Sequence, residues 1–256
     1  MKIVRFEWQG KASWGILEGE SIFALDGDIY GEFDRGKEMC QLSEVRLLAP
    51  AEPTTGVACG RNYMDHIKEM DWPVPEEPNL FFKPANTVIG PADDIIYPAI
   101  STDLRYEAEL CLVIKKLAKN VPEERAMDYV LGYTCGNDVT AIDWFIKSEG
   151  LDLIRTKGCD TAGPLGPWLV TDIDPHNLAI KGRVNGETRQ DSRTSLMLFS
   201  VPRLIQEITS FLTLRPGDVV WTGTPEGGAS PVKMGDVIEV EIEGIGILKN
   251  RIVAPK

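Results

Sequence analysis

The sequence contains no long hydrophobic run, only two histidines and no closely paired cysteines. Its apolar runs fall far short of the roughly 20 residues that a membrane-spanning helix needs, and charged residues at positions 5, 7 and 11 interrupt the first segment. We therefore expect neither a membrane span nor a signal peptide. The five cysteines are widely spaced and form no CxxC pair, which disfavours a disulfide framework or a zinc ribbon and predicts reduced thiols in a cytoplasmic protein.

Basic residues are scarce relative to acidic ones. The 256 residues include 27 Lys and Arg against 39 Asp and Glu, which gives a formal net charge of −12. Nucleic acids and anionic membrane surfaces are bound mainly through Lys and Arg, so this balance argues against both as partners. An acidic protein that handles an anionic small-molecule substrate needs a local cation, and any site for such a substrate has to supply one.

The order of apolar and turn-forming segments predicts a β-rich α+β fold. Residues 1–50 are expected to form a small strand-rich domain, and the segment LLAPAEPTT connects it to a larger domain over residues 51–256. The segments PEERAMDYVLG and SVPRLIQEITSFL are typical of helices, whereas Asn185-Gly186 predicts a β-hairpin. Strands and helices do not alternate regularly, which disfavours a doubly wound parallel fold.

Two carboxylates enter an apolar strand in the segment RYEAEL. Glu107 and Glu109 are two residues apart, so a strand would direct both side chains to one face, where they would repel and burial would raise their pKa. A divalent cation bound through oxygen ligands, such as Mg²⁺, Mn²⁺ or Ca²⁺, would resolve both problems. The alternative is a solvated strand end that blunts a sheet edge. The pattern alone favours this alternative, because oxygen-only metal sites usually need further ligands.

Two other acidic residues have a possible role in chemistry. Asp138 ends the apolar segment GYTCGND just before a predicted helix, and spacing alone favours a helix N-cap over a third metal ligand. Glu69 lies three residues after His66, so a short helix would place both on one face, where the pair could take a proton from water. A surface contact is the more common outcome for such a pair. The other histidine, His176, lies in a turn and is expected to be solvated.

Two further segments could bind an anion. Lys157, in the glycine-rich stretch IRTKGCDTAGPLGP, could orient a carboxylate or stabilise an oxyanion, although an isolated lysine is normally solvated. In WTGTPEGG, backbone N–H groups and the hydroxyl of Thr222 or Thr224 could hold an anionic group, although a tight turn between strands is the simpler interpretation. This segment lacks the lysine and the spacing of a P-loop, which disfavours nucleotide binding.

Taken in order, these segments resemble the fumarylacetoacetate hydrolase superfamily. The resemblance covers roughly residues 52–254 and rests on GRNYMDHIKEM, FFKPANTVIG, RYEAEL, GYTCGND, TKGCDT, VNGETRQ and TGTPEG. It is closest to the small single-core members, which include acylpyruvate hydrolases, oxaloacetate decarboxylases and the hydroxyheptadienedioate isomerase/decarboxylase of homoprotocatechuate breakdown. The resemblance implies a β-rich mixed roll around a barrel-like sheet, like the C-terminal domain of that family, and a homodimer.

The resemblance also implies roles for individual residues, and it makes Asp138 a metal ligand rather than a cap. The implied ligands of Mg²⁺ or Mn²⁺ are Glu107, Glu109 and Asp138, the catalytic residues are His66, Glu69 and Lys157, and the substrate contacts are Arg61, Tyr63 and Thr224. The implied activity is cleavage or isomerisation of small 2-oxo (di)carboxylic acids through an enolate that the metal stabilises.

Departures from the family pattern bear on the substrate. Ile142 and Phe145 stand where acylpyruvase-like members carry an arginine and a glutamine. Arg61 stands where larger relatives have an extra aspartate ligand, and it could add a cation for an anionic substrate.

Three hypotheses follow for the function. The leading one is a metal-dependent hydroxyheptadienedioate isomerase/oxopentene-tricarboxylate decarboxylase or an acylpyruvate C–C hydrolase of aromatic or keto-acid catabolism. The departures at Ile142 and Phe145 motivate the alternative, a non-catalytic metal- or carboxylate-binding β domain. A structural protein built on a surface acidic strand is the third.

Overall fold

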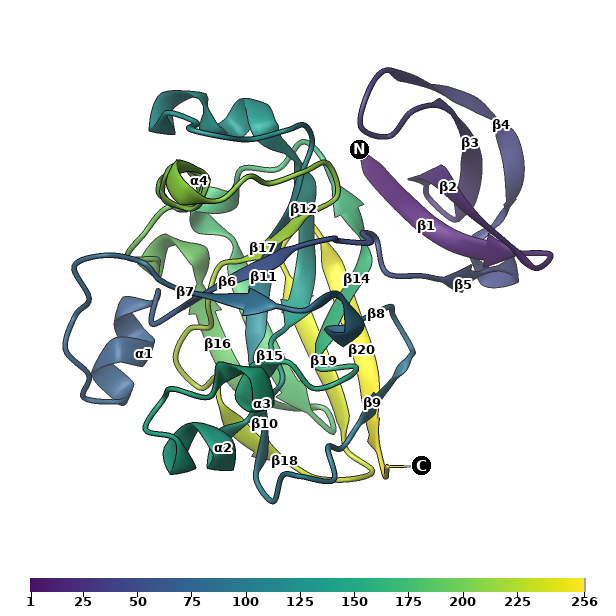
Figure 1. Cartoon of the computed structure of the whole chain (residues 1–256). Coiled ribbons are helices and arrows are strands. Elements are labelled where there is room, and N and C mark those ends of the chain that lie inside the picture. Colours follow the sequence, from purple (N-terminus) through teal and green to yellow (C-terminus); the bar gives the residue numbers. More distant parts are fainter. Residues whose placement is uncertain (256) are drawn as a thin grey trace.

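The strands of the molecule form three β-sheets, and its helices are short (Figure 1). The computed structural model describes residues 1–255. The largest sheet has 12 strands, the second has five and the third has three. This arrangement confirms the predicted β-rich α+β class.

The order of the strands across each sheet differs from their order along the chain. Across the largest sheet lie β4 (Phe33–Gln41), β3 (Ser21–Gly27), β2 (Lys11–Glu18), β1 (Lys2–Trp8), β14 (Gly163–Val170), β12 (Val130–Asn137), β11 (Ala108–Ile114), β17 (Val219–Trp221), β6 (Gly56–Gly60) and β7 (Asn79–Lys83), with β5 (Arg46–Leu47) beside β1 and β8 (Val88–Ile89) beside β14. Across the second sheet lie β16 (Glu187–Arg193), β15 (Ala179–Val184), β19 (Val237–Ile242), β20 (Gly246–Val253) and β9 (Asp94–Ile96). Across the third lie β13 (Thr140–Ala141), β10 (Leu104–Tyr106) and β18 (Ser230–Val232).

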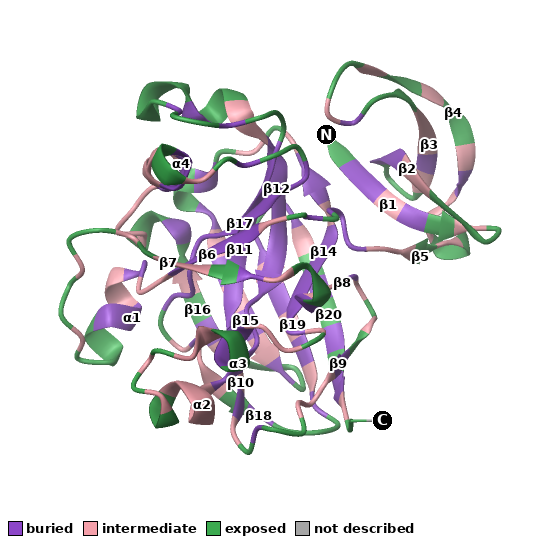
Figure 2. Ribbon diagram, in the orientation of Figure 1, coloured by how far each residue is buried: buried purple, intermediate pink, exposed green. Residues whose placement is uncertain are grey.

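Strand β11 forms the centre of the fold, and all seven of its residues are buried (Figure 2). Its side chains alternate between two apolar environments, as the pleat of a strand requires. Leu110 and Leu112 pack in the core between this sheet and the five-stranded sheet, which contributes Ile180. On the opposite face, Cys111 packs with Trp221. A carboxylate on this strand is therefore buried away from water and held in position by close packing.

The predicted hairpin is confirmed in the five-stranded sheet. Strands β15 and β16 pair antiparallel, and Asn185 and Gly186 form the turn between them. Both turn residues have positive φ, 54° and 81°, which two-residue hairpin turns require and which Asn and Gly tolerate best.

The helices are α1 (Met64–Glu69), α2 (Ile142–Lys147), α3 (Leu153–Lys157) and α4 (Val201–Phe211), and the 3-10 helices are η1 (Leu42–Glu44), η2 (Ala85–Thr87), η3 (Glu123–Tyr129), η4 (Pro175–Asn177) and η5 (Thr194–Leu196). Helix α4 begins as predicted, because the Ser200 side chain accepts a hydrogen bond from the backbone N–H of Arg203. The helix predicted in PEERAMDYVLG is instead the 3-10 helix η3.

The first strands form a group at one end of the largest sheet (Figure 1). Strand β1 pairs antiparallel with β14, so this group is hydrogen-bonded to the rest of the sheet. The division into domains of residues 1–50 and 51–256 stays a prediction. All five cysteines are free, as predicted. Within residues 1–255, no helix is long and apolar enough to span a membrane.

Candidate active site

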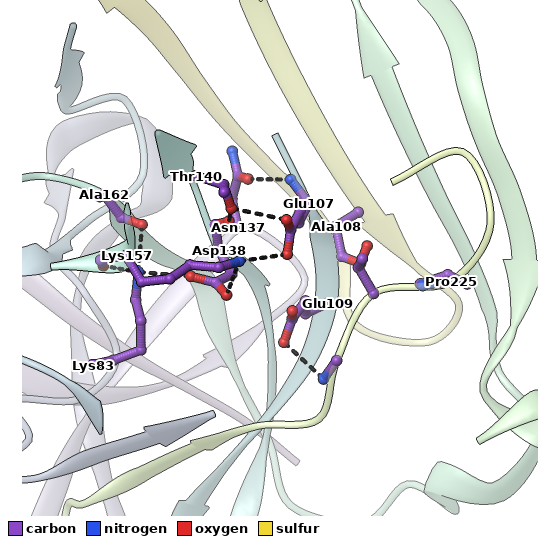
Figure 3. Close-up of polar contacts among 12 residues, drawn as sticks. Lys83, Glu107, Ala108, Glu109, Asn137, Asp138, Thr140, Lys157, Ala162 and Pro225 are labelled. Carbon is purple, nitrogen blue, oxygen red and sulfur yellow. Dashed lines mark hydrogen bonds and ion pairs between the residues drawn. The ribbon is translucent and has the colours of Figure 1, made fainter. Parts of the chain in front are cut away.

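Three buried carboxylates converge where β11 and β12 lie side by side (Figure 3). Glu107 precedes β11, Glu109 lies within it, and Asp138 follows the end of β12. One oxygen from each carboxylate lies within 4.8 Å of the others. The residues are 8%, 2% and 1% exposed, respectively, so the alternative of a solvated strand end is wrong.

The cap role that spacing favours for Asp138 is also wrong. Helix α2 begins at Ile142, and its N-cap is Ala141. The backbone N–H of Asp138 donates to the carbonyl of Glu107 at 2.9 Å, which holds the two carboxylate-bearing segments together. Asp138 therefore belongs to the carboxylate cluster, as the family resemblance implies.

Short hydrogen bonds fix the two glutamates. The Thr140 hydroxyl donates to Glu107 Oε1 at 2.8 Å, and the backbone N–H of Glu107 donates to Asn137 Oδ1 at 3.0 Å. The backbone N–H of Gly223 donates to Glu109 Oε2 at 2.9 Å. Of the four oxygens of these two glutamates, Glu107 Oε1 and Glu109 Oε2 accept from these donors.

Two buried lysines supply the local cations that the acidic composition demands. Lys157 Nζ lies 2.8 Å from Glu107 Oε2 and 2.6 Å from Asp138 Oδ2. Lys83 Nζ lies 2.7 Å from Asp138 Oδ1. Both lysines come from the ends of their elements, α3 and β7, and both are labelled in Figure 3.

Burial and the neighbouring charges move the pKa values of these groups in different directions. Burial, reinforced by Asp138 and Glu107, raises the pKa of Glu109 well above its ordinary 4.5. Burial would also raise the pKa of Asp138, but Lys157 and Lys83 together hold it below its ordinary value. Burial would lower the pKa of Lys157, but Asp138 and Glu107 outweigh it and raise that pKa.

The donor set fits a hard divalent cation. Among the described residues Glu109 forms no ion pair, and burial together with the charges of Asp138 and Glu107 raises its pKa. Carboxylate oxygens are ligands that Mg²⁺ and Mn²⁺ favour, and the cluster contains no sulfur or nitrogen donor that would select zinc. Glu107, Glu109 and Asp138 are therefore the residues that could hold the ion.

The predicted dyad forms on helix α1. His66 Nδ1 lies 2.8 Å from Glu69 Oε2. A carboxylate can only accept, so Nδ1 carries the hydrogen and Nε2 keeps the lone pair that a base needs. His66 is only 5% exposed, whereas the Glu69 side chain is 33% exposed, so the pair is buried on the imidazole side and open to solvent on the carboxylate side. His176 is exposed, as predicted.

The loop after β17 contacts both the His66–Glu69 pair and the carboxylate cluster. The backbone N–H of Gly227 donates to Glu69 Oε2 at 3.2 Å, and Gly223, in the same loop, donates to Glu109. The Thr224 hydroxyl donates to the carbonyl of Ala108 at 3.0 Å and accepts from Gln190 Nε2 at 2.7 Å.

The two other predicted substrate contacts are placed differently. Arg61 is half-buried and stacks over the Trp72 ring at 4.5 Å, in a left-handed conformation with φ 57°. The His66 ring meets the same Trp72 edge-on, with the ring centroids 5.5 Å apart. Tyr63 is fully buried, and its hydroxyl has no hydrogen-bond partner among residues 1–255. Substrate binding by Arg61 and Tyr63 stays a prediction.

The positions that depart from the family pattern lie on α2. Ile142 and Phe145 are both half-buried. A Cβ added at Gly150 would lie 3.2 Å from the Phe145 ring, so this ring packs closely against the turn that follows the helix. A cavity of about 650 Å³ elsewhere, between β5 and β20, has no predicted site residue in its lining.

Sequence reasoning missed three residues of the site. Lys83, Gln190 and Trp72 lie in segments that carry the family resemblance or flank them, yet the sequence patterns predicted no role for them. One sequence pattern could have indicated Lys83, because this lysine directly follows the apolar run NLFF. Gln190 offered no comparable signal, because its partner Thr224 lies 34 residues away. Trp72, which stacks with Arg61, offered none either.

Known families and proteins match this chain over most of its length. Residues 55–253 match the family described as fumarylacetoacetate (FAA) hydrolase C-terminal, and residues 1–50 match one described as Rv2993c-like, N-terminal. The chain therefore belongs to the fumarylacetoacetate hydrolase family, and the resemblance drawn from its motifs is confirmed.

The names of related proteins refer to different reactions. A mitochondrial oxaloacetate tautomerase of Xenopus laevis is 45% identical over 230 residues, which cover 86% of this chain and 72% of that protein. The 2-hydroxyhepta-2,4-diene-1,7-dioate isomerase of Mycobacterium marinum is 37% identical, with a TM-score of 0.91 and coverage of 99% and 98%. A fumarylacetoacetate hydrolase from Exiguobacterium antarcticum is 36% identical, with a TM-score of 0.87 over the full length of both chains. The chain is an enzyme of this family, and its relatives share the fold rather than one reaction.

Proposed function

We propose that this chain is a divalent-metal-dependent enzyme that isomerises or cleaves small 2-oxo (di)carboxylic acids. The observation that carries the proposal is the buried cluster of three carboxylates in contact with two buried lysines. Its best-supported activities are those of a hydroxyheptadienedioate isomerase/decarboxylase and an acylpyruvate C–C hydrolase. The tautomerase and isomerase names among the relatives support the first of these.

The charge of the cluster supports an anionic substrate. When all groups are ionised, three carboxylates and two ammonium groups leave one net negative charge. One divalent cation, Mg²⁺ or Mn²⁺, would reverse this to one net positive charge. A site in an acidic protein would then attract a carboxylate, in a buried place where charge interactions are strong.

Each residue has a distinct task in this proposal. Bound Mg²⁺ or Mn²⁺ supplies Lewis-acid stabilisation of the negative charge that develops on the oxygens of a 2-oxo acid. Lys157 keeps one N–H that its two carboxylate partners do not use, and this N–H stabilises the developing oxyanion. Thr224 would orient the carboxylate of the substrate by exchanging the acceptor of its hydroxyl, which is the carbonyl of Ala108 in this structure, for a substrate oxygen.

The dyad favours hydrolysis as the second candidate reaction. Glu69 holds the imidazole of His66 by Nδ1, which leaves Nε2 to take a proton from water. The water would then attack the distal carbonyl of an acylpyruvate. Isomerisation needs only a proton shift, so the two reactions differ in their dependence on this pair.

A panel of acylpyruvates, oxaloacetate and hydroxyheptadienedioate, each tested with Mg²⁺ and Mn²⁺, decides between these activities. Metal-dependent turnover of any member supports the proposal, and the product identifies the reaction. If the chain binds metal and a 2-oxo acid but turns over none, the non-catalytic alternative motivated by Ile142 and Phe145 holds instead. The cytoplasmic location and the homodimer are part of the same proposal.

A further inference from the structure

Lys83 carries a buried positive charge that the proposed chemistry does not use. The residue is 1% exposed, and a charge so deep in a protein requires ionic or hydrogen-bonding partners. Its Nζ donates to the carbonyl oxygens of Lys157 at 2.8 Å and Ala162 at 2.9 Å, and lies 2.7 Å from Asp138 Oδ1. Two of its three N–H groups are therefore used by carbonyls and its charge is paired with Asp138, so all of these contacts are with the protein.

The second lysine of the site is held quite differently. Lys157 Nζ hydrogen-bonds only to the carboxylates of Glu107 and Asp138 among the residues described and lies 5.5 Å from the centroid of the Phe81 ring, and its side chain is 10% exposed against 0% for Lys83. The Lys83 ammonium is therefore enclosed by the protein, whereas the Lys157 ammonium retains an N–H and access to the site.

We propose that Lys83 is a positioning residue that fixes both the metal ligand Asp138 and the oxyanion-stabilising Lys157. This inference rests on the proposed function. One ammonium holds the Asp138 carboxylate by its side chain and Lys157 by its backbone carbonyl. The position of the Asp138 carboxylate relative to Lys157 then depends on the single ammonium group of Lys83.

The contacts of Asp138 show what this positioning does. The Lys83 ammonium lies beside Oδ1 as an ion pair, without a hydrogen bond, and Lys157 lies between Oδ2 and Glu107 Oε2. The carboxylate is thus turned so that Oδ2 is the oxygen on the side of Glu107. Groups that orient metal ligands in this way typically change metal affinity by about 10–100-fold when they are removed.

Close packing confines the stem of Lys83. A Cβ added at Gly56, on the neighbouring strand β6, would lie 3.0 Å from Lys83 Cβ and 2.5 Å from its carbonyl oxygen. A Cβ added at Gly163 would lie 3.4 Å from Lys83 Cε. The absence of side chains at both positions lets the lysine reach Asp138 along one fixed path.

The test compares Lys83→Met and Lys83→Gln with the wild-type chain. Mn²⁺ affinity is measured by calorimetric titration, folding by circular dichroism and thermal melting of the metal-free protein, and kcat and KM with the active member of the substrate panel. Lys119→Met is the matched control, because that exposed lysine donates only to the carbonyl of Ser210. We expect both Lys83 variants to bind Mn²⁺ about 10–100-fold more weakly, with kcat reduced more than KM is changed.

The outcomes separate this inference from the proposed function. A wild-type chain that binds no Mn²⁺ contradicts the proposed function and this inference with it. A wild-type chain that binds Mn²⁺, together with either folded Lys83 variant of undiminished affinity, overturns the inference alone.

A measurement on the wild-type chain covers the case in which neither variant folds. The ¹⁵N–¹H signal of the Lys83 ammonium should be protected from solvent exchange both without and with Mg²⁺. Rapid exchange in the Mg²⁺-loaded chain would mean that the ammonium leaves Asp138, and would overturn the inference.

Discussion

The backbone N–H of Gly227 donates to the carboxylate of Glu69 at 3.2 Å, across 158 positions of sequence. The same Glu69 oxygen lies 2.8 Å from His66 Nδ1. Four residues before Gly227, the N–H of Gly223 donates to Glu109. A single loop thus aligns the base of the dyad and one ligand of the proposed metal site.

Gly227→Ala tests this alignment. Gly227 has a φ of 77°, and an added Cβ would lie 2.2 Å from the carbonyl oxygen of Arg189, which cannot move away as a flexible side chain could. We expect a loss of about 1–3 kcal/mol in the free energy of unfolding, and a fall in hydrolytic kcat because Glu69 loses its donor. Denaturant unfolding and steady-state kinetics measure the two effects.

Gly186→Ala is the control for that variant. Its φ of 81° is equally left-handed, but an added Cβ meets nothing within 4 Å. It should show the backbone strain without the clash or the change in kcat. Equal losses of kcat in both variants would contradict the role proposed for the Gly227 loop.

Substitution of the dyad separates the two candidate reactions. In His66→Gln and Glu69→Gln, hydrolysis of an acylpyruvate should fall by about 10²–10⁴-fold, the usual contribution of a general base. Proton-shift activity on oxaloacetate or hydroxyheptadienedioate should fall far less, because no water has to be activated. Parallel assays of both reactions on the same preparations give the ratio, and undiminished hydrolysis would remove the dyad from the mechanism.

Glu109→Gln tests how far the buried, unpaired carboxylate of Glu109 destabilises the metal-free protein. The amide removes a charge that burial, Asp138 and Glu107 all disfavour, while its oxygen can still accept from Gly223. The metal-free variant should melt higher than the metal-free wild type at alkaline pH, by about 2–4 °C for each kcal/mol gained, yet bind Mn²⁺ more weakly. A lower melting temperature would show that the carboxylate stabilises the fold.

The raised pKa of Glu109 also predicts a pH dependence. In the metal-free protein the folded state holds this proton more tightly than the unfolded state, so the stabilisation is full below the ordinary pKa of 4.5 and is lost as pH rises through the folded value. Metal binding displaces the same proton and therefore strengthens with pH.

Melting curves with and without Mn²⁺ measure this dependence. The rise in melting temperature on adding Mn²⁺ should be larger at about pH 8 than at about pH 6, because fewer protons then compete for Glu109. Glu109→Gln should flatten the trend. A constant or decreasing rise would be inconsistent with a raised pKa at this position.

Local sequence patterns predicted those features that depend on neighbouring residues. The hairpin at Asn185-Gly186 follows from the conformational freedom of two adjacent residues, and α4 follows from its apolar face and the Ser200 cap. The common face of Glu107 and Glu109 follows from the pleat of one strand. In each case the determinant lies within one element, where periodicity can reveal it.

Features that depend on distant partners were not accessible in the same way. Asp138 has the spacing of a helix cap, and only the family resemblance made it a ligand. Lys83 is held by groups 74 and 79 residues away in the chain, and those are backbone carbonyls that no side-chain pattern can mark. The segment PEERAMDYVLG forms the 3-10 helix η3 in place of the expected helix, and only Ala126 of that element is buried.

The most direct test of the central claim is the rate of turnover of the active 2-oxo acid as a function of free Mn²⁺, starting from chelator-treated protein. We predict that the wild-type rate is negligible without metal and saturates over the Mn²⁺ range in which one ion binds per chain. The variants Glu107→Ala and Asp138→Ala should neither bind Mn²⁺ nor turn over the substrate. Full turnover without metal, or undiminished turnover in these two variants, would contradict the claim that the buried carboxylates hold the ion on which the reaction depends.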